Sequence, residues 1–388
     1  MRALALIDGE HYPSTVRDAL AELPYEFAGA LMVGGTEKLR GDAGYGVPVY
    51  ADLEGALAEI EPEVVYDLSD EPVLGPAARF RVASRVLAAG IPYVGADFRL
   101  EPPELEPFPL PSLSVFATGK RVGKTAVSTH VARLLSRDGR HAASDYLEIA
   151  AIAGVVTIGC RRCGGGLAGA VATSNVAAGA EIALQRSPDV VVFDGSGAAI
   201  PPVATGKRVL VTSAFDLPEL VTGYLNAYRI LLADLVVITM ADARTSHDAL
   251  ADAIREVKPE ARVIAVGFQP RPLAAVDGRR AAYFTTARPQ ARGRLAEELV
   301  QLGAEVVHVS GALADRAALR RELDTVDADV FVTELKAAGI DLVAETGARR
   351  GIEVVLAANE LVPVPGQREL DPALVALADQ AQAEPVAG

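Results

Sequence analysis

The chain has 388 residues, a formal net charge of −14 and a hydrophobic content of 50%. This length allows two or three domains with sizeable cores, and the hydrophobic content excludes an intrinsically disordered chain. The negative charge argues against nucleic acid and anionic membranes as partners. We expect no bilayer-spanning segment and no signal peptide. Because two cysteines cannot form a disulfide framework, a reducing cytoplasm is the expected compartment.

Strand-like and helix-like segments alternate over residues 1–100 and predict a Rossmann-like N-terminal domain. Ligands of such folds bind where the strands end, which makes polar residues there candidates. Asp8 and His11 follow the first expected strand, and Lys38 follows the second. A turn histidine with only local hydrogen bonds is the alternative for His11. The expected strands are 3–8, 30–33, 64–67 and 92–95, with helices near 14–22 and 77–89.

Residues 101–111 carry five prolines. Each proline lacks a backbone N–H and biases the preceding residue away from helix. We therefore expect a stiff, extended linker and a domain boundary here.

The stretch from Ser114 to Thr125 has the order of a P-loop, with an apolar strand, a glycine-containing turn and Gly-Lys-Thr at the start of an Ala-rich helix. The usual spacing places glycine five positions before Gly123. This chain has Thr118 there, followed by Gly119, so the loop is a variant. Its N–H groups are expected to approach phosphate oxygens. A lysine-rich surface turn is the alternative. The predicted nucleotide-binding residues are Thr118, Gly119, Lys120, Arg121, Val122, Gly123, Lys124 and Thr125.

A P-loop nucleotide-binding domain is predicted over 112–278, and a further α/β portion with parallel strands over 279–388. The P-loop helix is expected to end near Ser136, and a second helical pattern begins at His141. A doubly wound sheet requires a strand between two such helices. Either this sheet is short of one strand or the chain lacks a segment. The later expected strands are 155–159, 189–194, 208–212, 233–239, 262–267, 282–286, 305–309, 328–333 and 352–357. The later expected helices are 216–230, 245–256, 290–302, 312–323 and 336–350, with a short helical pattern after 367.

Asp194 ends an apolar strand 70 residues after Lys124. A carboxylate at this place fits a Walker B residue that holds Mg²⁺ directly or through water, and the Thr125 hydroxyl is the second expected metal ligand. A strand-end aspartate that caps a turn is the alternative.

The loop Cys160–Gly166 also follows an expected strand. Arg161 and Arg162 can grip phosphates bidentately, while Gly164 and Gly165 expose backbone N–H groups. The loop therefore predicts a polyanion site. A redox dithiol and a flexible surface loop are the alternatives, whereas a four-thiolate zinc site is excluded because no further cysteine exists.

Two further cations follow expected strands in the C-terminal portion. Lys336 lies in Glu334-Leu335-Lys336, and Arg288 lies in Thr285-Thr286-Ala287-Arg288-Pro289. Either side chain could meet a phosphate, and a solvated surface cation is the equally plausible alternative.

Taken together, these motifs resemble the cyclic 2,3-diphosphoglycerate synthetase family over nearly the whole chain. Members of this family are expected to carry a further strand and a glycine-rich loop between the P-loop helix and the segment that begins at His141. In this chain only Gly139-Arg140 bridges that gap. The segments that carry the resemblance are 6–13 (LIDGEHYP), 33–39 (VGGTEKL), 117–125 (ATGKRVGKT), 141–146 (HAASDY), 159–169 (GCRRCGGGLAG), 194–202 (DGSGAAIPP) and 333–338 (TELKAA).

The resemblance implies an ATP- and Mg²⁺-dependent ring closure of 2,3-bisphosphoglycerate in a cytoplasmic enzyme, with a homodimer as the expected assembly. The implied catalytic residues are Lys124, Arg161, Arg162 and Lys336. The implied substrate-binding residues are Asp8, His11, Lys38, Arg161, Arg162, Gly164, Gly165 and Lys336.

Two other functions stay open at this point. One is a P-loop ligase of the dethiobiotin synthetase type, which the Thr-Gly-x-x-Val-Gly-Lys-Thr pattern permits but which explains neither the N-terminal domain nor the arginine pair. The other is a non-catalytic nucleotide-binding regulator, which the missing strand favours. Dinucleotide binding by the N-terminal domain is a weak option, because Gly34-Gly35 gives no G-x-G-x-x-G.

Overall fold

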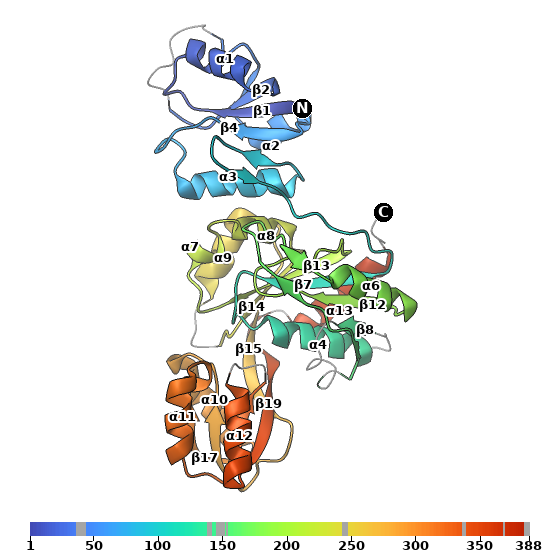
Figure 1. The fold of residues 1–388 in the computed structure, drawn as a ribbon, viewed down its shortest axis with the longest axis vertical. Coiled ribbons are helices and arrows are strands. Elements are labelled where there is room, and N and C mark those ends of the chain that lie inside the picture. The colour runs from blue at the N-terminus through green and yellow to red at the C-terminus, as the bar shows by residue number, and fades with distance from the viewer. Residues whose placement is uncertain are drawn as a thin grey trace.

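The computed structural model describes residues 1–35, 44–137, 142–144, 152, 154–242, 247–335, 339–367 and 369–383. Three α/β parts follow one another along the long axis of the molecule, with the N-terminal sheet at one end and the C-terminal sheet at the other (Figure 1). This architecture confirms the predicted fold class, a Rossmann-like N-terminal domain followed by a P-loop domain and a further α/β portion.

The N-terminal part is a six-stranded sheet in the order β3-β2-β1-β4-β5-β6. All its strands run parallel except β6. Strand β1 lies at the centre between β2 and β4, and its residues Ala3 to Leu6 are fully buried. The order reverses between β1 and β4, which is the position where ligands of doubly wound sheets bind. The elements are β1 (Arg2–Ile7), α1 (Pro13–Glu22), β2 (Glu26–Met32), β3 (Val49–Tyr50), α2 (Leu53–Ile60), β4 (Val64–Asp67), α3 (Pro76–Ala88), β5 (Tyr93–Val94) and β6 (Arg99–Leu100).

The middle and C-terminal parts share one sheet of eleven strands among the described residues, in the order β17-β16-β18-β19-β15-β14-β13-β7-β12-β8-β9. The P-loop strand β7 lies between β12 and β13, with all three parallel. The middle elements are β7 (Ser112–Ala117), α4 (Lys124–Arg137), β8 (Ala142–Ser144), β9 (Val156–Thr157), β10 (Arg162–Cys163), β11 (Thr173–Ser174), α6 (Val176–Gln185), β12 (Val190–Asp194), β13 (Lys207–Ser213), α7 (Pro218–Val221), α8 (Asn226–Leu232), β14 (Leu235–Thr239) and α9 (Asp248–Val257).

The helical pattern expected from His141 is wrong at Ala142–Ser144. These residues form strand β8, which pairs in parallel with β12 and with β9. Alanine favours a helix by intrinsic propensity, but the ladder with β12 overrides that preference. Among the described residues the sheet therefore has two short strands between α4 and α6, β8 of three residues and β9 of two.

The single helix expected over 216–230 is also wrong, because the structure divides it into α7 and α8. Tyr224, between the two helices, adopts a left-handed φ of 47° that a helix cannot contain. Helix α8 packs against α3 of the N-terminal part. Next to this contact, the ring of Tyr224, which precedes α8, lies 5.6 Å from the ring of Phe80 in α3.

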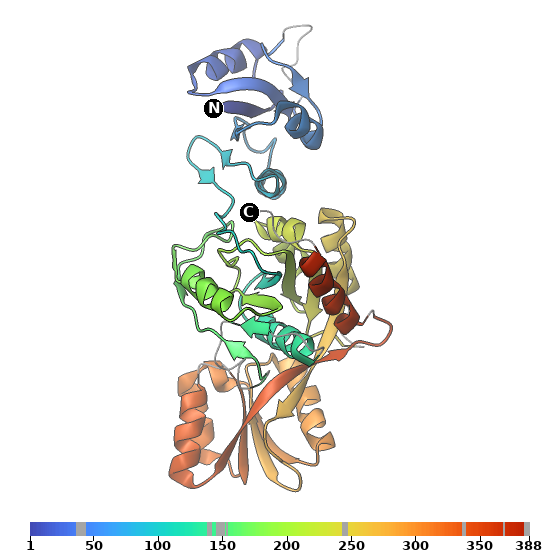
Figure 2. The ribbon, with the colours of Figure 1, turned by 90° about the vertical axis from the view of Figure 1, so that its right-hand side faces the viewer.

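Two long strands connect the middle part to the C-terminal part. β15 pairs in parallel with β14 through its first residues and antiparallel with β19 through the rest, and the start of β19 pairs with β18. Figure 2 shows β19 crossing from the C-terminal part to the middle part. The C-terminal elements are β15 (Val263–Pro272), β16 (Arg280–Phe284), α10 (Pro289–Gln301), β17 (Glu305–Ser310), η1 (Ala312–Ala314), α11 (Arg316–Thr325), β18 (Val330–Glu334), α12 (Ile340–Arg350), β19 (Glu353–Pro363) and α13 (Leu370–Ala383).

The last helix, α13, packs on the middle part rather than on the C-terminal sheet. Its Leu374 and Leu377 belong to the core that also contains Leu113 of β7 and Val127 of α4. Residues from the end of the chain therefore complete the core of the P-loop part. The domain boundaries given above stay predictions.

We predict that Leu374→Ala lowers the free energy of unfolding by about 2–5 kcal/mol, because it removes a fully buried side chain from this core. Gln380→Ala, at an exposed position of the same helix, is the matched control and should change it by less than about 0.5 kcal/mol. Urea unfolding followed by circular dichroism measures both. Equal effects of the two substitutions would show that α13 does not belong to the core.

Candidate active site

The P-loop is fixed to the two strands that follow it in the sheet. The backbone N–H of Thr118 donates to the carbonyl of Val211 at 3.0 Å, and its hydroxyl lies 3.1 Å from that of Thr212. The Thr239 hydroxyl, at the end of β14, donates to the Val122 carbonyl at 2.6 Å. These bonds attach both halves of the loop to β13 and β14, so the loop has a defined shape.

Two loop residues have left-handed backbone conformations. The φ angles of Arg121 and Gly123 are 64° and 83°. A Cβ atom on Gly123 would lie 2.4 Å from the Phe268 ring, so only glycine fits at this position. Turns of this kind point successive N–H groups to one side and favour anion binding. The local geometry therefore agrees with the phosphate role that the sequence predicts.

Lys124 and Asp194 form a buried ion pair beside the loop. The Lys124 ammonium contacts Asp194 Oδ1, and the residue Asp194 is only 4% exposed. Parallel pairing of β7 with β12 places Asp194 opposite Val115, which explains how residues 70 positions apart meet. Asp194 Oδ2 is buried and has no hydrogen-bond partner among the described residues. A buried carboxylate oxygen without a partner is expected to receive a ligand such as a cation or water.

A cavity of about 610 Å³, which we call the P-loop cavity, opens over the loop. Its size falls in the range of small-molecule sites. Ser196 and Gly197 border it at one side, and Arg271 and Asn359 border it from the ribbon of β15 and β19. The predicted nucleotide-binding residues that line it are Gly119, Lys120, Arg121, Gly123, Lys124 and Thr125, while Val122 is buried beneath them.

The glycine-rich loop lies on the other side of the turn that follows Asp194. Arg162 donates to the carbonyls of Gly164 and Ser196, and the backbone N–H of Arg161 donates to the Asn175 side chain at 2.7 Å. A second cavity of about 220 Å³, which we call the arginine cavity, is lined by Arg161, Arg162, Asp194 and Ser196. Gly164 and Gly165 belong to the same loop without lining this cavity.

Arg162 retains capacity for a further partner. Its Nε atom is buried and makes no hydrogen bond, and no carboxylate pairs with either arginine of the loop within the part of the chain that the structure describes. Both positive charges are therefore available to an anion in the arginine cavity. Because Ser196 borders both cavities, groups bound in the two would approach each other at the Asp194 turn, which we define as residues 194–198.

The C-terminal part contributes a polar cluster to the P-loop cavity that the sequence analysis missed. Glu334, at the end of β18, is 6% exposed and accepts hydrogen bonds from Thr285 Oγ1 at 2.6 Å and from the Thr286 N–H and hydroxyl at 2.8 Å each. Burial, and then the charge of Glu334, raise the pKa of Tyr283. The only signal in the sequence was an acidic residue at the end of an expected strand, because its threonine partners lie 48 and 49 positions away.

Arg288, which the sequence analysis considered as a phosphate ligand, lies elsewhere. It donates to the Phe215 carbonyl at 3.0 Å and contacts Asp216 at 3.5 Å, and it does not line the P-loop cavity. Burial raises the pKa of Asp216, with Arg288 acting against that shift. Lys38 and Lys336 lie outside the described residues.

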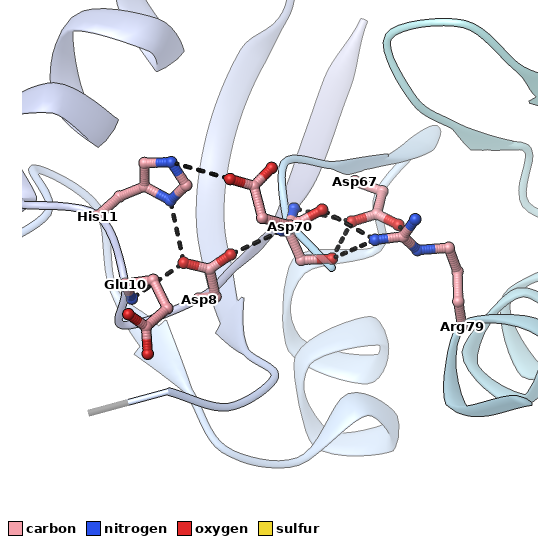
Figure 3. Close-up of polar contacts among 7 residues, drawn as sticks. Asp8, Glu10, His11, Asp67, Asp70 and Arg79 are labelled. Carbon is pink, nitrogen blue, oxygen red and sulfur yellow. Dashed lines mark hydrogen bonds and ion pairs between the residues drawn. The ribbon is translucent and has the colours of Figure 1, made fainter. Parts of the chain in front are cut away.

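Asp8 and His11 lie in a separate cluster at the β1–β4 reversal of the N-terminal sheet (Figure 3). Asp8 Oδ1 lies 3.0 Å from His11 Nδ1, Asp8 Oδ2 accepts from the Asp70 N–H at 2.7 Å, and Arg79 contacts Asp67 at 3.0 Å. The structure does not bring these residues to the P-loop cavity or the arginine cavity. Their carboxylates would repel an anionic substrate, so the substrate role predicted for Asp8 and His11 gains no support from this geometry.

Within the described ranges, no group of three or more His, Cys, Asp or Glu side chains is arranged to hold a metal ion by itself. No helix in the described segments is both long and apolar enough to cross a bilayer.

Comparison with known proteins identifies the family. Three family models match: the cyclic 2,3-diphosphoglycerate synthetase N-terminal domain over residues 2–101, its P-loop domain over 135–266 and its C-terminal domain over 272–360. A cyclic 2,3-diphosphoglycerate synthetase from Rubrobacter xylanophilus is 44% identical, covering 97% of both chains. The chain belongs to the cyclic 2,3-diphosphoglycerate synthetase family. Synthetases from Pyrococcus furiosus and Methanothermobacter thermautotrophicus are 39% and 34% identical and cover 97% and 98% of this chain and 97% of each relative.

The alignment with the Rubrobacter relative is longer than this chain. It spans 433 positions, 45 more than the 388 residues of this chain, so the relative has residues without a counterpart here. Among solved structures, a DUF1611 family protein from Anabaena variabilis matches at 15% identity with a TM-score of 0.21, covering 83% of this chain and 97% of that chain, which is too low to support an argument.

We predict that Lys124→Met lowers the free energy of unfolding by about 3–5 kcal/mol, because it leaves Asp194 buried without its cation. The double variant Lys124→Met/Asp194→Asn should recover most of that stability, since no isolated charge remains. Both variants should fail to bind nucleotide, as measured by calorimetric titration. Nucleotide binding by the stable double variant at the wild-type affinity would contradict the phosphate role of Lys124.

Proposed function

We propose that this protein catalyses the ATP-dependent cyclisation of 2,3-bisphosphoglycerate to cyclic 2,3-diphosphoglycerate, with release of ADP and phosphate. The observation that carries this proposal is the Asp194 turn, whose Ser196 borders both the P-loop cavity and the arginine cavity. ATP would occupy the first cavity and the substrate the second. Membership of a family of synthetases supports this function over a dethiobiotin-type ligase or a binding regulator.

The reaction requires two substitutions at phosphorus. First, an oxygen of one substrate phosphate attacks the γ-phosphorus of ATP, and the bond to ADP breaks. The first substrate phosphate now carries the transferred phosphoryl group. An oxygen of the other substrate phosphate then attacks the phosphorus of that first phosphate, and the transferred group leaves as inorganic phosphate with the electron pair of the broken bond. The second step forms the cyclic anhydride. One ATP is consumed and one ADP and one phosphate are released for each ring closed.

The main physical obstacle is repulsion between phosphates. Two unit charges 4 Å apart cost about 4 kcal/mol at an effective dielectric constant of 20, and each phosphate carries more than one charge. Arg161, Arg162 and Lys120 would offset this cost at the border of the two cavities. Because both attacking groups belong to one bound molecule, ring closure is intramolecular, which can supply about 7–11 kcal/mol.

Mg²⁺ is the metal that we propose for the nucleotide. The residues fit this ion: Asp194 Oδ2 is a buried oxygen without a hydrogen-bond partner among the described residues, and Thr125 lines the P-loop cavity next in sequence to Lys124, which contacts the same carboxylate. These two residues would hold the ion, with further positions left to nucleotide phosphates and water. When bound, Mg²⁺ would neutralise charge on the phosphate oxygens during transfer.

We also propose a cytoplasmic homodimer. The cytoplasm rests on the low cysteine content, because two cysteines in 388 residues suit a reducing compartment, and the homodimer rests on the family resemblance alone. Sedimentation velocity of the purified protein would test the assembly, and a single species at the monomer mass would contradict it.

Phosphorus NMR of the wild-type protein with Mg-ATP and 2,3-bisphosphoglycerate tests the proposed reaction. We predict new phosphoanhydride signals from the product, with ADP and inorganic phosphate appearing in equal amounts. ATP hydrolysis without a cyclic product would contradict cyclisation, and so would the absence of any reaction.

The same assay tests the arginine cavity. We predict that Arg161→Ala raises the KM for bisphosphoglycerate by at least about tenfold while the KM for ATP changes by less than twofold, because one charged hydrogen-bonding partner of the substrate is lost. Arg186→Ala, at an exposed position after α6 that lines neither cavity, is the matched control and should leave both constants unchanged. Equal rises in the two KM values would argue against a substrate-specific role of Arg161.

A further inference from the structure

A buried arginine that the proposed function has not used lies on α8. Arg229 is only 3% exposed, and among the described residues no carboxylate pairs with it. Its three nitrogens instead donate to backbone carbonyls: Nε to Ala198 at 2.8 Å, Nη1 to Leu225 at 2.9 Å and Nη2 to Leu167 at 3.0 Å. Burial lowers the pKa of Arg229 to about 10, so the side chain stays charged at neutral pH.

Two of the three carbonyls belong to the segments that form the arginine cavity. Ala198 is in the Asp194 turn, and Leu167 directly follows the glycine-rich loop that carries Arg161 and Arg162. The Ile200 N–H donates to the Gly169 carbonyl at 2.9 Å, which adds a second connection just beyond the C-terminal ends of the turn and the loop. The planar guanidinium of Arg229 therefore connects the turn to the end of the loop.

Arg162 holds the same turn at a second position, because it donates to the Ser196 carbonyl. Lys120 of the P-loop packs against the same turn, since a Cβ atom on Gly197 would lie 3.3 Å from its Cγ. The carbonyls of Ser196 and Ala198, two residues apart, are thus each held by a guanidinium. The position of the turn relative to both cavities depends on these two contacts.

The chemistry of the three carbonyls requires arginine at position 229. A planar guanidinium has donors pointing in three directions, whereas a lysine ammonium is a compact point charge on a flexible stem. A hydrophobic residue would leave the carbonyls of Ala198 and Leu167 without this donor. Burying a cation without a carboxylate costs desolvation free energy, which its hydrogen bonds must offset. Because two of these bonds hold the turn and the residue after the loop, we infer that they maintain the arrangement of these segments.

We propose that Arg229 is a positioning residue that fixes the Asp194 turn against the glycine-rich loop, and that it thereby sets the distance between the two cavities. This inference rests on the proposed function for its catalytic consequence, but not for its structural content. Arg229 touches neither cavity, so it acts through the backbone that carries Asp194, Ser196 and the arginine pair.

The test compares Arg229→Lys with Lys258→Met. Lys258 donates to the carbonyls of Leu231 and Ala233 at 3.1 and 2.7 Å, at the other end of α8, and has no bond to the turn. We expect Arg229→Lys to lower kcat for cyclisation by about 100-fold, with the KM for ATP within twofold of wild type, because a small misplacement of reacting groups has an effect of this size. Lys258→Met should leave kcat within twofold.

Hydrogen exchange gives a readout that needs no activity. In Arg229→Lys, amides of residues 195–200 and 164–170 should exchange at least tenfold faster than in wild type, whereas amides of α9 should not change. Unchanged exchange in these segments would overturn the inference, as would an equal loss of kcat in Lys258→Met. Wild-type kcat with faster exchange would remove the catalytic role. If the wild-type protein forms no cyclic product, the proposed function fails, and the exchange result alone decides whether Arg229 fixes the turn.

Discussion

The parallel pairing of β7 with β12 is the constraint on which the rest of the site depends. It places the residues that follow two buried strands side by side, so the P-loop meets the Asp194 turn and Lys124 meets Asp194. Because both strands are buried on both faces, a shift of register would expose their apolar side chains and move the ion pair apart. The nucleotide-binding geometry is therefore a consequence of core packing in the sheet.

An acidic protein that binds polyanions needs cations that its own carboxylates do not neutralise. The described structure achieves this at Arg162, whose guanidinium is held by the backbone carbonyls of Gly164 and Ser196. A carbonyl has a dipole but no net charge, so it fixes the side chain without cancelling its positive charge. By contrast, Arg79 and Arg288 lie next to carboxylates and are less suited to an anionic ligand.

Patterns that depend on neighbouring residues in the sequence predicted most of the fold. The alternation of apolar strands with helices, the P-loop and the Asp194 strand end were all apparent, because each follows from local periodicity and turn chemistry. Ala142–Ser144 was mistaken for helix, since three small residues have no strand signature until β12 pairs with them. The return of α13 to the P-loop core also depends on long-range contacts.

The site was predictable only in part. Gly119 to Thr125 and the two arginines of the glycine-rich loop line cavities as their motifs suggest, with Val122 buried beneath the loop. Glu334 and Arg229 were not predicted, because their roles arise from partners far away in the sequence. Arg229 stands between Tyr228 and Ile230 in a short helix, where an arginine is usually a solvated surface residue. Its burial becomes evident only when the Asp194 turn and the glycine-rich loop are seen to pack on it.

We propose that two ligands meet at the Asp194 turn, one in the P-loop cavity and one in the arginine cavity. A crystal structure of the protein with Mg²⁺, a non-hydrolysable ATP analogue and 2,3-bisphosphoglycerate tests it most directly. We expect the γ-phosphate at Lys124 and a substrate phosphate at Arg161 and Arg162, with Ser196 between the two ligands. Bisphosphoglycerate bound instead at the Asp8 and His11 cluster of the N-terminal part, with the arginine cavity empty, would contradict it.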